Sequence, residues 1–439
     1  MVQTQPKVLI TDNINPKAQD ILKDVADVVF EKSLSHEELL QKIRDFDALM
    51  IRSASTVKQD ILDNADCLKI VGRAGVGTDN IDLDAATQKG VIVVNSPEGN
   101  TVAASEHTVG MLMALARHIP EGDASLKAGQ WNRSKLTGVE VFGKVLGVIG
   151  FGKIGRRVAK TCQALGMKIA VYDPFLSKAR AEELGVELAT LDDIWSRADF
   201  ITIHAPKTKE TANLINTETL AKCKKGVRFV NCARGGIINE TDLVAAIESG
   251  HVAGAALDVF NEEPLSPDSP LLKLGNKVIV TPHLGASTEE AQINVAIDVA
   301  QQIRDFFQDG SAQSAVNIPM LRKEVLEPVK HYMPMAEVLG KLIGQIAKGG
   351  IQSVEITAKG TIHDLDISPL TLAVLKGLLS LNREGVNYVN ARPIAEDRGI
   401  EVKQTSVKKL SSYQNLLKVT VITDTATYQV AGTLIHGDN

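Results

Sequence analysis

Short apolar runs alternate with amphipathic stretches over the first hundred residues. Buried strands are predicted for KVLITD, DVVF, ALMIRS, LKIVGRAG and VIVVN, which occupy residues 7–12, 27–30, 48–53, 68–75 and 91–95. Helical spacing separates them in PKAQDILKD and HEELLQKIRD. This alternation is typical of a parallel α/β unit. A longer helix is expected from about Thr101 to His118, capped by Thr101 or Asn100, and the polar stretch 119–143 is expected to be irregular.

A second unit begins near residue 144 and contains six further apolar runs separated by helical patterns. The runs are KVLGVIG, KIAVYD, DFITIHAP, VRFVNCARG, AGAALDVF and KVIVTPH. Six parallel strands with intervening helices are the number found in a doubly wound dinucleotide fold.

The pattern changes again after residue 283. A long helical stretch over residues 284–307 leads into a polar linker, DGSAQSAVNIP. Beyond about residue 320, a third unit is expected, with a helix in EVLGKLIGQIAKG and a strand in SVEITAKG. LLKVTVITD and TYQVAGTLI form a candidate hairpin near the end.

Composition narrows the classes of partner. The net charge of −5 gives no broad attraction to nucleic acid or to an anionic membrane. The longest apolar run, VGMLMALA, is far shorter than the roughly 18 residues of a membrane span. The start, MVQTQPKVLITD, lacks the features of a signal peptide. Four cysteines without a C-x-x-C pair argue against a disulfide framework or a metal site, and favour a reducing cytoplasm.

Gly150, Gly152 and Gly155 form a G-x-G-x-x-G pattern between an apolar run and a helical stretch. In a dinucleotide site these glycines permit a tight turn, close approach of a pyrophosphate and close helix packing. Asp173 ends the next predicted strand, where its carboxylate would bind ribose hydroxyls and favour NAD over NADP. The structural alternatives are a glycine turn without a ligand and a capping role for Asp173 beside Pro174.

Polar residues follow the remaining strands of the second unit, and the carboxyl ends of parallel strands meet at one ligand-binding edge. His283 suits a proton acceptor, because imidazole titrates near neutral pH. Arg234 suits a carboxylate, which its guanidinium matches in a bidentate manner. Glu263, placed just after the expected strand residue Phe260, would fix the tautomer of the imidazole. Separately, His283 and Arg234 are equally compatible with ordinary loop residues. His107, inside the long helix, is expected to be a packing residue.

Three signatures, VIGFGKIG, VNCARGGIINE and the pair LDVFNEEP with VTPHLGAST, closely resemble those of the D-isomer-specific 2-hydroxyacid dehydrogenases. The resemblance runs from about residue 7 to 316. The segments IRSAS, GRAGVGTDNIDLDAA and PEGNTVAASEHT are similar to the long-chain branch that oxidises 3-phosphoglycerate. The resemblance therefore implies an NAD-dependent oxidoreductase that forms 3-phosphohydroxypyruvate, the first step towards serine.

The same resemblance assigns roles to individual residues. Arg234, Glu263 and His283 become the catalytic residues. Cofactor contacts are implied for Val76, Gly150, Gly152, Lys153, Ile154, Gly155, Asp173, Ala205, Cys232, Ala233, Arg234, Asp258, His283, Gly285 and Ala286. Substrate contacts are implied for Arg52, Ser53, Gly75, Arg234 and His283, with Arg133 and Lys135 lent by a neighbouring subunit. A surface ion pair is the alternative for Arg52.

The resemblance also implies a domain plan. A discontinuous, flavodoxin-like substrate-binding domain of residues 1–100 and 285–316 would enclose a Rossmann-type NAD-binding domain of residues 101–284. Residues 317–439 would form an α+β intervening domain of allosteric type. Such enzymes commonly form homodimers or homotetramers. Most continue into a small ACT domain that binds serine, but this chain stops at TLIHGDN, too soon to contain one. Either the natural protein lacks the domain or the sequence is truncated, and both alternatives leave serine feedback in doubt.

Two other functions remain open from the sequence. One is the reduction of hydroxypyruvate, glyoxylate or another 2-keto acid, against which Arg52 and the third domain argue. The other is an NAD-sensing binding protein, since some relatives of this fold act as transcriptional corepressors and retain much of the catalytic triad.

Overall fold

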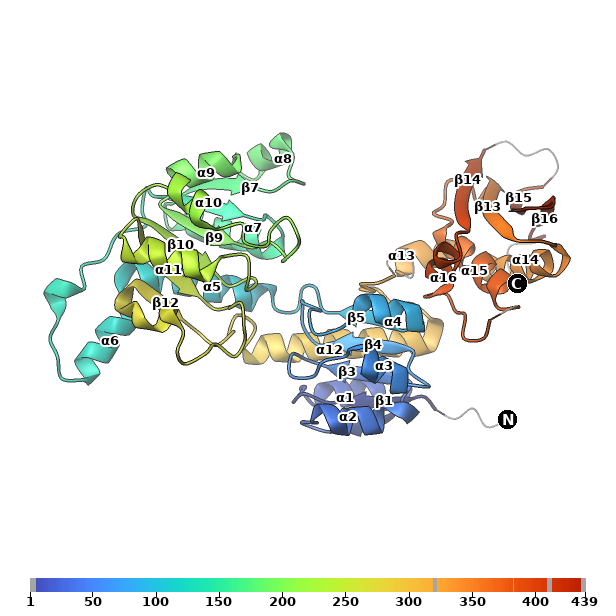
Figure 1. The fold of residues 1–439 in the computed structure, drawn as a ribbon, viewed down its shortest axis with the longest axis horizontal. Coiled ribbons are helices and arrows are strands. Elements are labelled where there is room, and N and C mark those ends of the chain that lie inside the picture. The colour runs from blue at the N-terminus through green and yellow to red at the C-terminus, as the bar shows by residue number, and fades with distance from the viewer. Residues whose placement is uncertain (1–4, 319–321, 382, 409–412, 436–439) are drawn as a thin grey trace. The chain divides into compact units, whose positions relative to one another are not determined.

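The computed structural model describes residues 5–318, 322–381, 383–408 and 413–435. The backbone divides into two compact units, unit 1 with Met1–Pro97 and Ile293–Asn439, and unit 2 with Glu98–Gln292 (Figure 1). The sequence start discussed above includes residues 1–4, and the chain end includes residues 436–439; both lie outside the described residues. The expected boundaries of three domains stay a prediction.

The first part of unit 1 is a parallel five-stranded sheet in the order β2-β1-β3-β4-β5. This is the flavodoxin-like order expected from the sequence. The strands are β1 (Lys7–Ile10), β2 (Asp27–Phe30), β3 (Ala48–Ile51), β4 (Ile70–Arg73) and β5 (Ile92–Asn95). The helices are α1 (Lys17–Leu22), α2 (His36–Lys42), α3 (Gln59–Asn64), α4 (Leu83–Lys89) and α12 (Glu289–Asp309).

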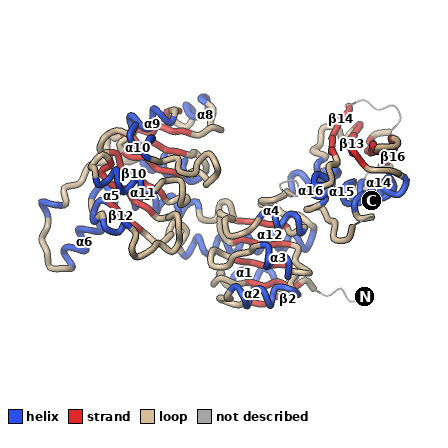
Figure 2. The backbone as a smooth tube through the Cα atoms, viewed as in Figure 1, coloured by secondary structure: helices blue, strands red, loops and turns tan. Residues whose placement is uncertain are grey.

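Both faces of this sheet are buried, because successive side chains of a strand point to opposite sides. Val8 and Ile10 of β1 pack in the core that includes α1 and α12, whereas Leu9 packs in the core that includes α2, α3 and α4. Figure 2 shows this arrangement of helices around the strands. The apolar runs in the sequence were continuous for this reason.

Unit 2 contains a parallel seven-stranded sheet in the order β12-β11-β10-β9-β6-β7-β8. Its strands are β6 (Val145–Ile149), β7 (Lys168–Tyr172), β8 (Glu187–Leu188), β9 (Phe200–Ile203), β10 (Val227–Asn231), β11 (Val252–Leu257) and β12 (Val278–Val280). Its helices are α5 (Thr101–Arg117), α6 (Ile119–Lys127), α7 (Lys153–Ala164), α8 (Lys178–Glu183), α9 (Leu191–Arg197), α10 (Thr217–Lys222) and α11 (Glu240–Glu248).

The order of these strands confirms the doubly wound dinucleotide fold. Helices α5 and α7 cover one face, and α9, α10 and α11 cover the other. The order reverses between β6 and β9, and ligands of such sheets bind outside the carboxyl ends of the strands at this switch point. The glycine turn after β6 lies at that place.

Three local expectations for unit 2 were wrong, and a fourth, the cap of α5, was met in position only. The short strand β8 was missed because its two residues are exposed and carry no apolar run. The stretch expected to be irregular contains helix α6, which buries only Ser125 and therefore has no apolar stripe to reveal it. Strand β11 ends at Leu257, so Phe260 lies in the following loop. Asn100 occupies the N-cap of α5, but its side chain makes no capping hydrogen bond.

The C-terminal part of unit 1 is an α+β arrangement with its own apolar core. Its sheet has the order β14-β13-β15-β16, with β13 and β14 parallel and the other pairs antiparallel. The elements are α13 (Lys323–Leu326), α14 (Met333–Ile346), β13 (Ile351–Gly360), α15 (Ser368–Leu379), α16 (Ala391–Asp397), β14 (Glu401–Val407), β15 (Asn415–Thr423) and β16 (Thr427–Gly432). The expected hairpin is β15 with β16.

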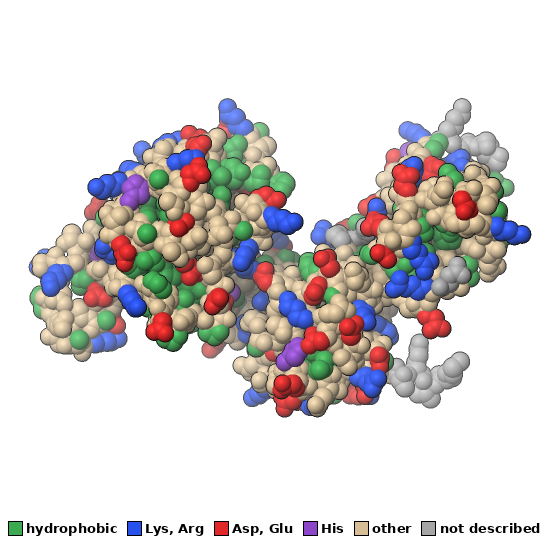
Figure 3. Space-filling view, viewed as in Figure 1, with side chains coloured by type: hydrophobic (Ala, Val, Ile, Leu, Met, Phe, Trp, Pro, Cys, Tyr) green, Lys and Arg blue, Asp and Glu red, His purple; other side chains and the backbone are tan. Residues whose placement is uncertain are grey.

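The surface agrees with the mild net charge. On the face drawn in Figure 3, basic and acidic side chains of the described residues are interspersed. None of the helices in the described part of the chain is long and apolar enough to cross a membrane.

Candidate active site

The glycine turn between β6 and α7 is shaped by two close backbone contacts and one open position. Gly150 has a φ of +90°, and a Cβ there would lie 2.6 Å from the carbonyl oxygen of His204. A Cβ on Gly155 would lie 2.2 Å from the carbonyl oxygen of Gly150. Gly152 has nothing within 4 Å of its ideal Cβ position. Protein packing thus accounts for the first and third glycines but not for the second.

The space at Gly152 fits a dinucleotide. Gly152 is the N-cap residue of the 12-residue helix α7, and no side chain caps this end. The first N–H groups of a helix lack internal partners and carry partial positive charge, so they suit a pyrophosphate. The absence of a side chain at Gly152 leaves room for this anion to approach the backbone. The residues present therefore fit a bound NAD.

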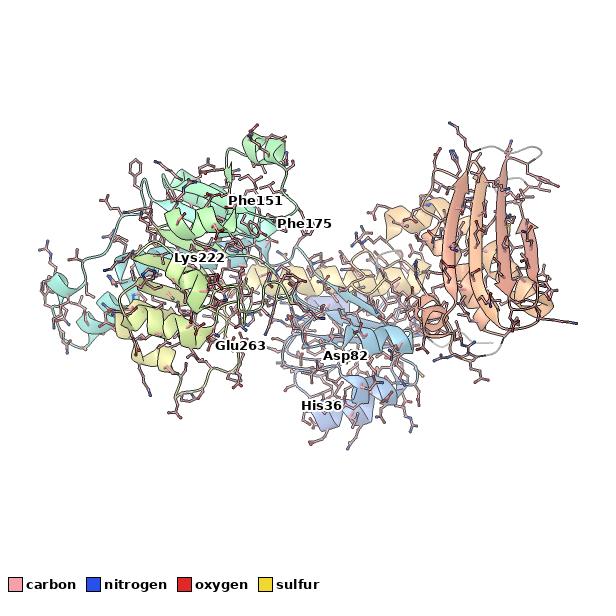
Figure 4. The ribbon with its side chains drawn as sticks, turned by 45° about the horizontal axis from the view of Figure 1, so that its top comes forward. His36, Asp82, Phe151, Phe175, Lys222 and Glu263 are labelled. Atoms are coloured by element: carbon pink, nitrogen blue, oxygen red, sulfur yellow. The ribbon has the colours of Figure 1, made fainter. Side chains whose placement is uncertain are left out.

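Asp173, immediately after β7, supports the glycine turn from the neighbouring strand. One carboxylate oxygen accepts the N–H of Phe151 at 2.7 Å, and the other accepts the N–H of Phe175 at 2.8 Å. Figure 4 labels Phe151 and Phe175 in unit 2. Asp173 therefore holds the backbone of the glycine turn and of its own following turn, whereas Ser177 is the N-cap of the next helix, α8. Each oxygen retains a further lone pair that could accept a ribose hydroxyl.

The loop after β10 carries Cys232, Ala233 and Arg234. The side chain of Asn231 accepts the N–H of Ala233 at 3.0 Å and donates to the carbonyl oxygen of Arg234 at 3.0 Å. The Arg234 guanidinium donates to the Ala233 carbonyl at 2.7 Å. A side chain at Gly235 would collide with the Phe260 carbonyl, because its Cβ would lie 1.7 Å from that oxygen. Glycine thus lets the Arg234 loop pack directly against the loop that carries Glu263.

His283 and Glu263, which come from different strand ends, lie together. His283 Nδ1 is 2.6 Å from one carboxylate oxygen of Glu263, and the other oxygen accepts the N–H of Phe260 at 3.0 Å. A carboxylate at Nδ1 favours the tautomer with the proton there, which leaves Nε2 as an acceptor. In the described part of the chain, Nε2 has no hydrogen-bond partner, and the His283 side chain is half exposed. Figure 4 labels Glu263 at the edge of unit 2.

The loop of His283 is anchored by the buried carboxylate of Asp258. The Asp258 side chain has no exposed surface. Its Oδ1 accepts the Thr281 hydroxyl at 2.5 Å and the Leu284 N–H at 2.7 Å, and its Oδ2 accepts the Gly285 N–H at 2.8 Å. The Asp258 carbonyl accepts the N–H of His283 itself at 3.0 Å. Burial opposes the charge, but these hydrogen bonds and one from His107 lower the pKa of Asp258.

Two other groups near these strand ends stay neutral near pH 7. Burial raises the pKa of the Cys232 thiol to about 12, and the charge of Asp258 adds to this shift. Burial lowers the pKa of His204 to about 4, and its Nε2 lies 3.0 Å from the Thr202 hydroxyl. Neither group therefore adds a charge to the nucleotide site.

In unit 1, Arg52 and Ser53 directly follow β3 in a loop that is held from both sides. Asp12 accepts the N–H groups of Arg52 and Ser55 at 2.8 and 2.9 Å, and the Ser55 hydroxyl at 2.5 Å. Asn80 donates to the carbonyl oxygens of Arg52 and Ser55 at 2.7 and 2.6 Å. The loop conformation is thus fixed by polar side chains from two other segments.

The guanidinium of Arg52 is half buried. In the described part of the chain, it forms no ion pair or side-chain hydrogen bond. Burial lowers the pKa of Arg52, opposed by the charge of Asp12. A partly desolvated cation without a direct partner is an attractive site for an anion. This geometry contradicts the surface ion pair that was the alternative for Arg52.

The other predicted residues lie in three regions. Gly75 is buried after β4 with its carbonyl accepting the Ser96 N–H at 2.9 Å, and Val76 follows it. Half-buried or buried positions next to the strand ends of unit 2 are taken by Ile154, Ala205, Gly285 and Ala286, while the side chain of Lys153 pairs with Glu98. Arg133 and Lys135 lie exposed in a short 3-10 helix.

Four supporting residues were missed from the sequence. His107 was expected only to pack, yet its Nε2 lies 3.2 Å from both Asp258 Oδ1 and Thr281 Oγ1. Thr281, Asp12 and Asn80 likewise bind the loops of predicted site residues. Asp12 and Thr281 follow strands at their carboxyl ends, so this position was an available signal. Nothing in the local pattern distinguishes His107 or Asn80.

Comparisons with known proteins agree with these arrangements. Residues 109–285 match the D-isomer specific 2-hydroxyacid dehydrogenase NAD binding domain, and residues 328–439 match the D-3-phosphoglycerate dehydrogenase intervening domain. The chain is 50% identical over 434 residues to D-3-phosphoglycerate dehydrogenase from a Synechocystis species, covering 98% of this chain and 78% of that protein. The chain belongs to the D-3-phosphoglycerate dehydrogenase family.

Further relatives are similar to this chain in sequence or in fold. D-3-phosphoglycerate dehydrogenase of Bacillus subtilis is 44% identical, covering 98% of this chain and 81% of that protein. A glyoxylate reductase structure from Paecilomyes thermophila matches with a TM-score of 0.66 and 27% identity, over 72% of this chain and 99% of its own. D-lactate dehydrogenase from Aquifex aeolicus, complexed with NAD and lactic acid, matches with a TM-score of 0.62 and 28% identity. This match covers 69% of the present chain and 96% of that chain. Members of this family are NAD-dependent oxidoreductases, and the glycine turn fits that cofactor.

The open position at Gly152 yields a paired prediction. Gly152→Ala should leave the melting temperature unchanged, because its extended backbone accepts alanine and its Cβ meets no protein atom. It should nevertheless weaken NADH binding by about tenfold, since the methyl group would occupy the space of the pyrophosphate. Gly155→Ala should lower both the melting temperature and NADH affinity, because its Cβ meets a backbone carbonyl. Thermal melts and fluorescence titration with NADH measure these effects. Wild-type NADH affinity in Gly152→Ala would contradict the placement of the pyrophosphate.

Proposed function

We propose that this protein oxidises 3-phospho-D-glycerate to 3-phosphohydroxypyruvate with NAD, the first step towards serine. The observation that carries the chemistry is the 2.6 Å distance between His283 Nδ1 and a carboxylate oxygen of Glu263. The loop of Glu263 packs beside the loop of Arg234. The pair of His283 and Glu263 supplies a proton acceptor held in one tautomer, and Arg234 supplies a cation for the substrate carboxylate. The full-length similarity to D-3-phosphoglycerate dehydrogenases supports the choice of substrate.

The residues divide the reaction between them. NAD, held by the glycine turn and Asp173, would supply the acceptor for the hydride on the carbon that bears the hydroxyl group. His283 Nε2 accepts the hydroxyl proton, and Glu263 stabilises the resulting imidazolium from Nδ1. Arg234 binds the carboxylate and stabilises negative charge on the reacting oxygen. Exclusion of water from the reacting groups would strengthen each of these interactions.

Arg52 is proposed as the phosphate ligand. Its half-buried guanidinium and the loop fixed by Asp12 and Asn80 support this role, because a preorganised cation binds an anion without first ordering the chain. Ser53 and Gly75 are proposed beside it. These contacts would distinguish a phosphorylated substrate from hydroxypyruvate or glyoxylate, the substrates of the rival reductase.

The preference for NAD over NADP is assigned to Asp173. Its carboxylate would accept a hydrogen bond from the ribose hydroxyls and repel a 2′-phosphate. Cys232, Ala233 and Asp258 remain proposed cofactor contacts. The side chain of Asp258 is fully buried and accepts hydrogen bonds from other protein groups. A contact between this carboxylate and the cofactor would need an oxygen lone pair that those donors do not use.

A homodimer, or a tetramer made of two such dimers, is proposed. The proposed contact is the segment around α6. Figure 1 shows α6 and the chain after it projecting from the body of unit 2. Ile119, Leu126 and Trp131 in this segment expose 56, 58 and 81% of their surface, and exposed apolar surface of this kind suits a contact with another chain. A second copy that covers it would bring Arg133 and Lys135 to the partner's active site.

Two further proposals concern the rest of the chain. Residues 317–439 are proposed as an intervening domain of allosteric type, supported by the match over residues 328–439. The cytoplasm is the proposed compartment, supported by four cysteines that are all free thiols. The NAD-sensing alternative predicts NADH binding without turnover, and the assays below separate it from an enzyme.

His283→Asn should lower kcat by roughly 100-fold or more, because the positioned proton acceptor is lost. Asparagine is the suitable replacement, since residue 283 has a φ of +53° and asparagine tolerates this left-handed backbone. NADH affinity should stay within about threefold of the wild type. Retained NADH binding would show that the variant is folded. Steady-state assays with phosphohydroxypyruvate and NADH measure kcat, with His36→Gln in unit 1 as the control. A kcat near the wild-type value would refute the proton-transfer role.

Arg52→Gln should raise the KM for 3-phosphoglycerate by about tenfold or more, because a charge-assisted contact to phosphate contributes more than ~1.4 kcal/mol. The kcat/KM for hydroxypyruvate, which has no phosphate, should change by less than about twofold. Arg44→Gln removes an exposed guanidinium of the same unit, paired with Asp66, and is the matched control. Equal losses for both substrates would instead place Arg52 outside the phosphate site.

Light scattering should give a mass of two or four chains for the wild type. Trp131→Asp should shift the protein towards smaller species and lower kcat/KM, since a buried charge at an interface is costly and the lent cations would be lost. Leu272→Asp, which charges another exposed apolar side chain of unit 2, should leave the mass unchanged. A monomeric wild type with full activity would rule out a role for Arg133 and Lys135 in the active site of a second copy.

A further inference from the structure

His107 on α5 is the feature of unit 2 that the proposed chemistry leaves unused. Its half-buried side chain places Nε2 3.2 Å from Asp258 Oδ1 and 3.2 Å from Thr281 Oγ1. These two residues follow β11 and β12, whereas His107 belongs to the helix that covers one face of the sheet. The imidazole thus connects the helix layer to the carboxyl ends of two strands.

The groups that His107 contacts hold the backbone of the catalytic loop. Asp258 receives the Thr281 hydroxyl and the N–H groups of Leu284 and Gly285 on its carboxylate, and the N–H of His283 on its carbonyl. Residue 283 itself has a left-handed backbone, with φ +53°. Such a conformation is costly for a residue other than glycine, and it persists where surrounding hydrogen bonds hold the backbone. The bonds to Asp258 lie on both sides of this residue.

We propose that His107 is a positioning residue for proton transfer, which acts by holding the Asp258 carboxylate and, through it, the 281–285 backbone that presents His283. This inference rests on the proposed role of His283. The carboxylate is fully buried and has bonds on both oxygens. A donor from α5 at Oδ1 therefore limits its rotation, and a small rotation would displace the Leu284 and Gly285 N–H groups that bind it.

A metal ion is the competing use of this cluster, because His107, Cys232 and Asp258 place candidate ligand atoms within 4.8 Å of one another. The hydrogen bonds that Asp258 already makes oppose it. Asp258 Oδ1 already accepts the Thr281 hydroxyl and the Leu284 N–H. The hydrogen-bonded arrangement therefore accounts for the cluster without an ion.

The test compares His107→Leu with His107→Gln. Leucine fills similar space without a donor, whereas the glutamine amide nitrogen can take the place of Nε2. His107→Leu should lower kcat by about tenfold, with the KM for phosphohydroxypyruvate and the NADH affinity within about threefold of wild type. The primary isotope effect on kcat with deuterated NADH should rise, because the chemical step becomes slower. His107→Gln should recover most of the turnover.

Two further variants separate positioning from general stability. His251→Leu removes another half-buried imidazole of unit 2, whose Nε2 lies 2.9 Å from the Leu220 carbonyl, and it should lower the melting temperature without changing the isotope effect. Thr281→Val removes the hydroxyl from Asp258 and should lower kcat in the same way as His107→Leu. It keeps the inference testable if the leucine variant does not fold.

A double mutant decides whether His107 acts through His283. If it does, His107→Leu should have little further effect on turnover in the His283→Asn background, since coupled residues are not additive. An unchanged kcat in both His107→Leu and Thr281→Val, or the full tenfold loss from His107→Leu in the double mutant, would overturn the inference. Wild-type turnover in His283→Asn would instead overturn the proton-transfer role, and the inference with it.

Discussion

The buried carboxylate of Asp258 is the constraint on which the catalytic end of unit 2 depends. A charged side chain without exposed surface is tolerated only when hydrogen bonds replace its lost hydration. Here those bonds come from the loop after β12 and from α5. The same hydrogen bonds therefore stabilise the buried carboxylate and fix the conformation of the loop that carries His283. The low pKa of Asp258 follows from the same donors.

Close backbone packing completes the arrangement. The loops after β10 and β11 lie in direct contact because Gly235 has no side chain, and this brings the loop of Arg234 beside the loop of Glu263. Asn231 fixes the first loop through its side-chain amide. The three residues proposed for catalysis thus come from three strand ends, and each is set by bonds within unit 2. A rigid sheet that presents reactive groups on short loops is well suited to hydride chemistry, where small misplacements slow the reaction.

Unit 1 uses the same device at a different place. The loop of Arg52 and Ser53 follows a parallel strand, and its conformation is fixed by the side chains of Asp12 and Asn80. The guanidinium that it carries is partly desolvated, and the backbone from which it extends is fixed before any ligand binds. In both units the reactive or binding residue is conspicuous, whereas the residues that orient it are ordinary polar side chains from neighbouring segments.

The sequence alone determined the parallel α/β architecture, the glycine turn, the C-terminal hairpin and the choice of Arg234, Glu263 and His283 as candidates. These features depend on apolar periodicity and on residue types at strand ends, which are local. The sequence could not place β8 or α6, because neither buries an apolar face. It also did not reveal His107, Thr281, Asp12 and Asn80 as supports. Their roles depend on hydrogen bonds between segments as far as 174 residues apart, as for His107 with Thr281. Only the tertiary structure decides such bonds, because it determines which polar groups are buried together and must satisfy one another.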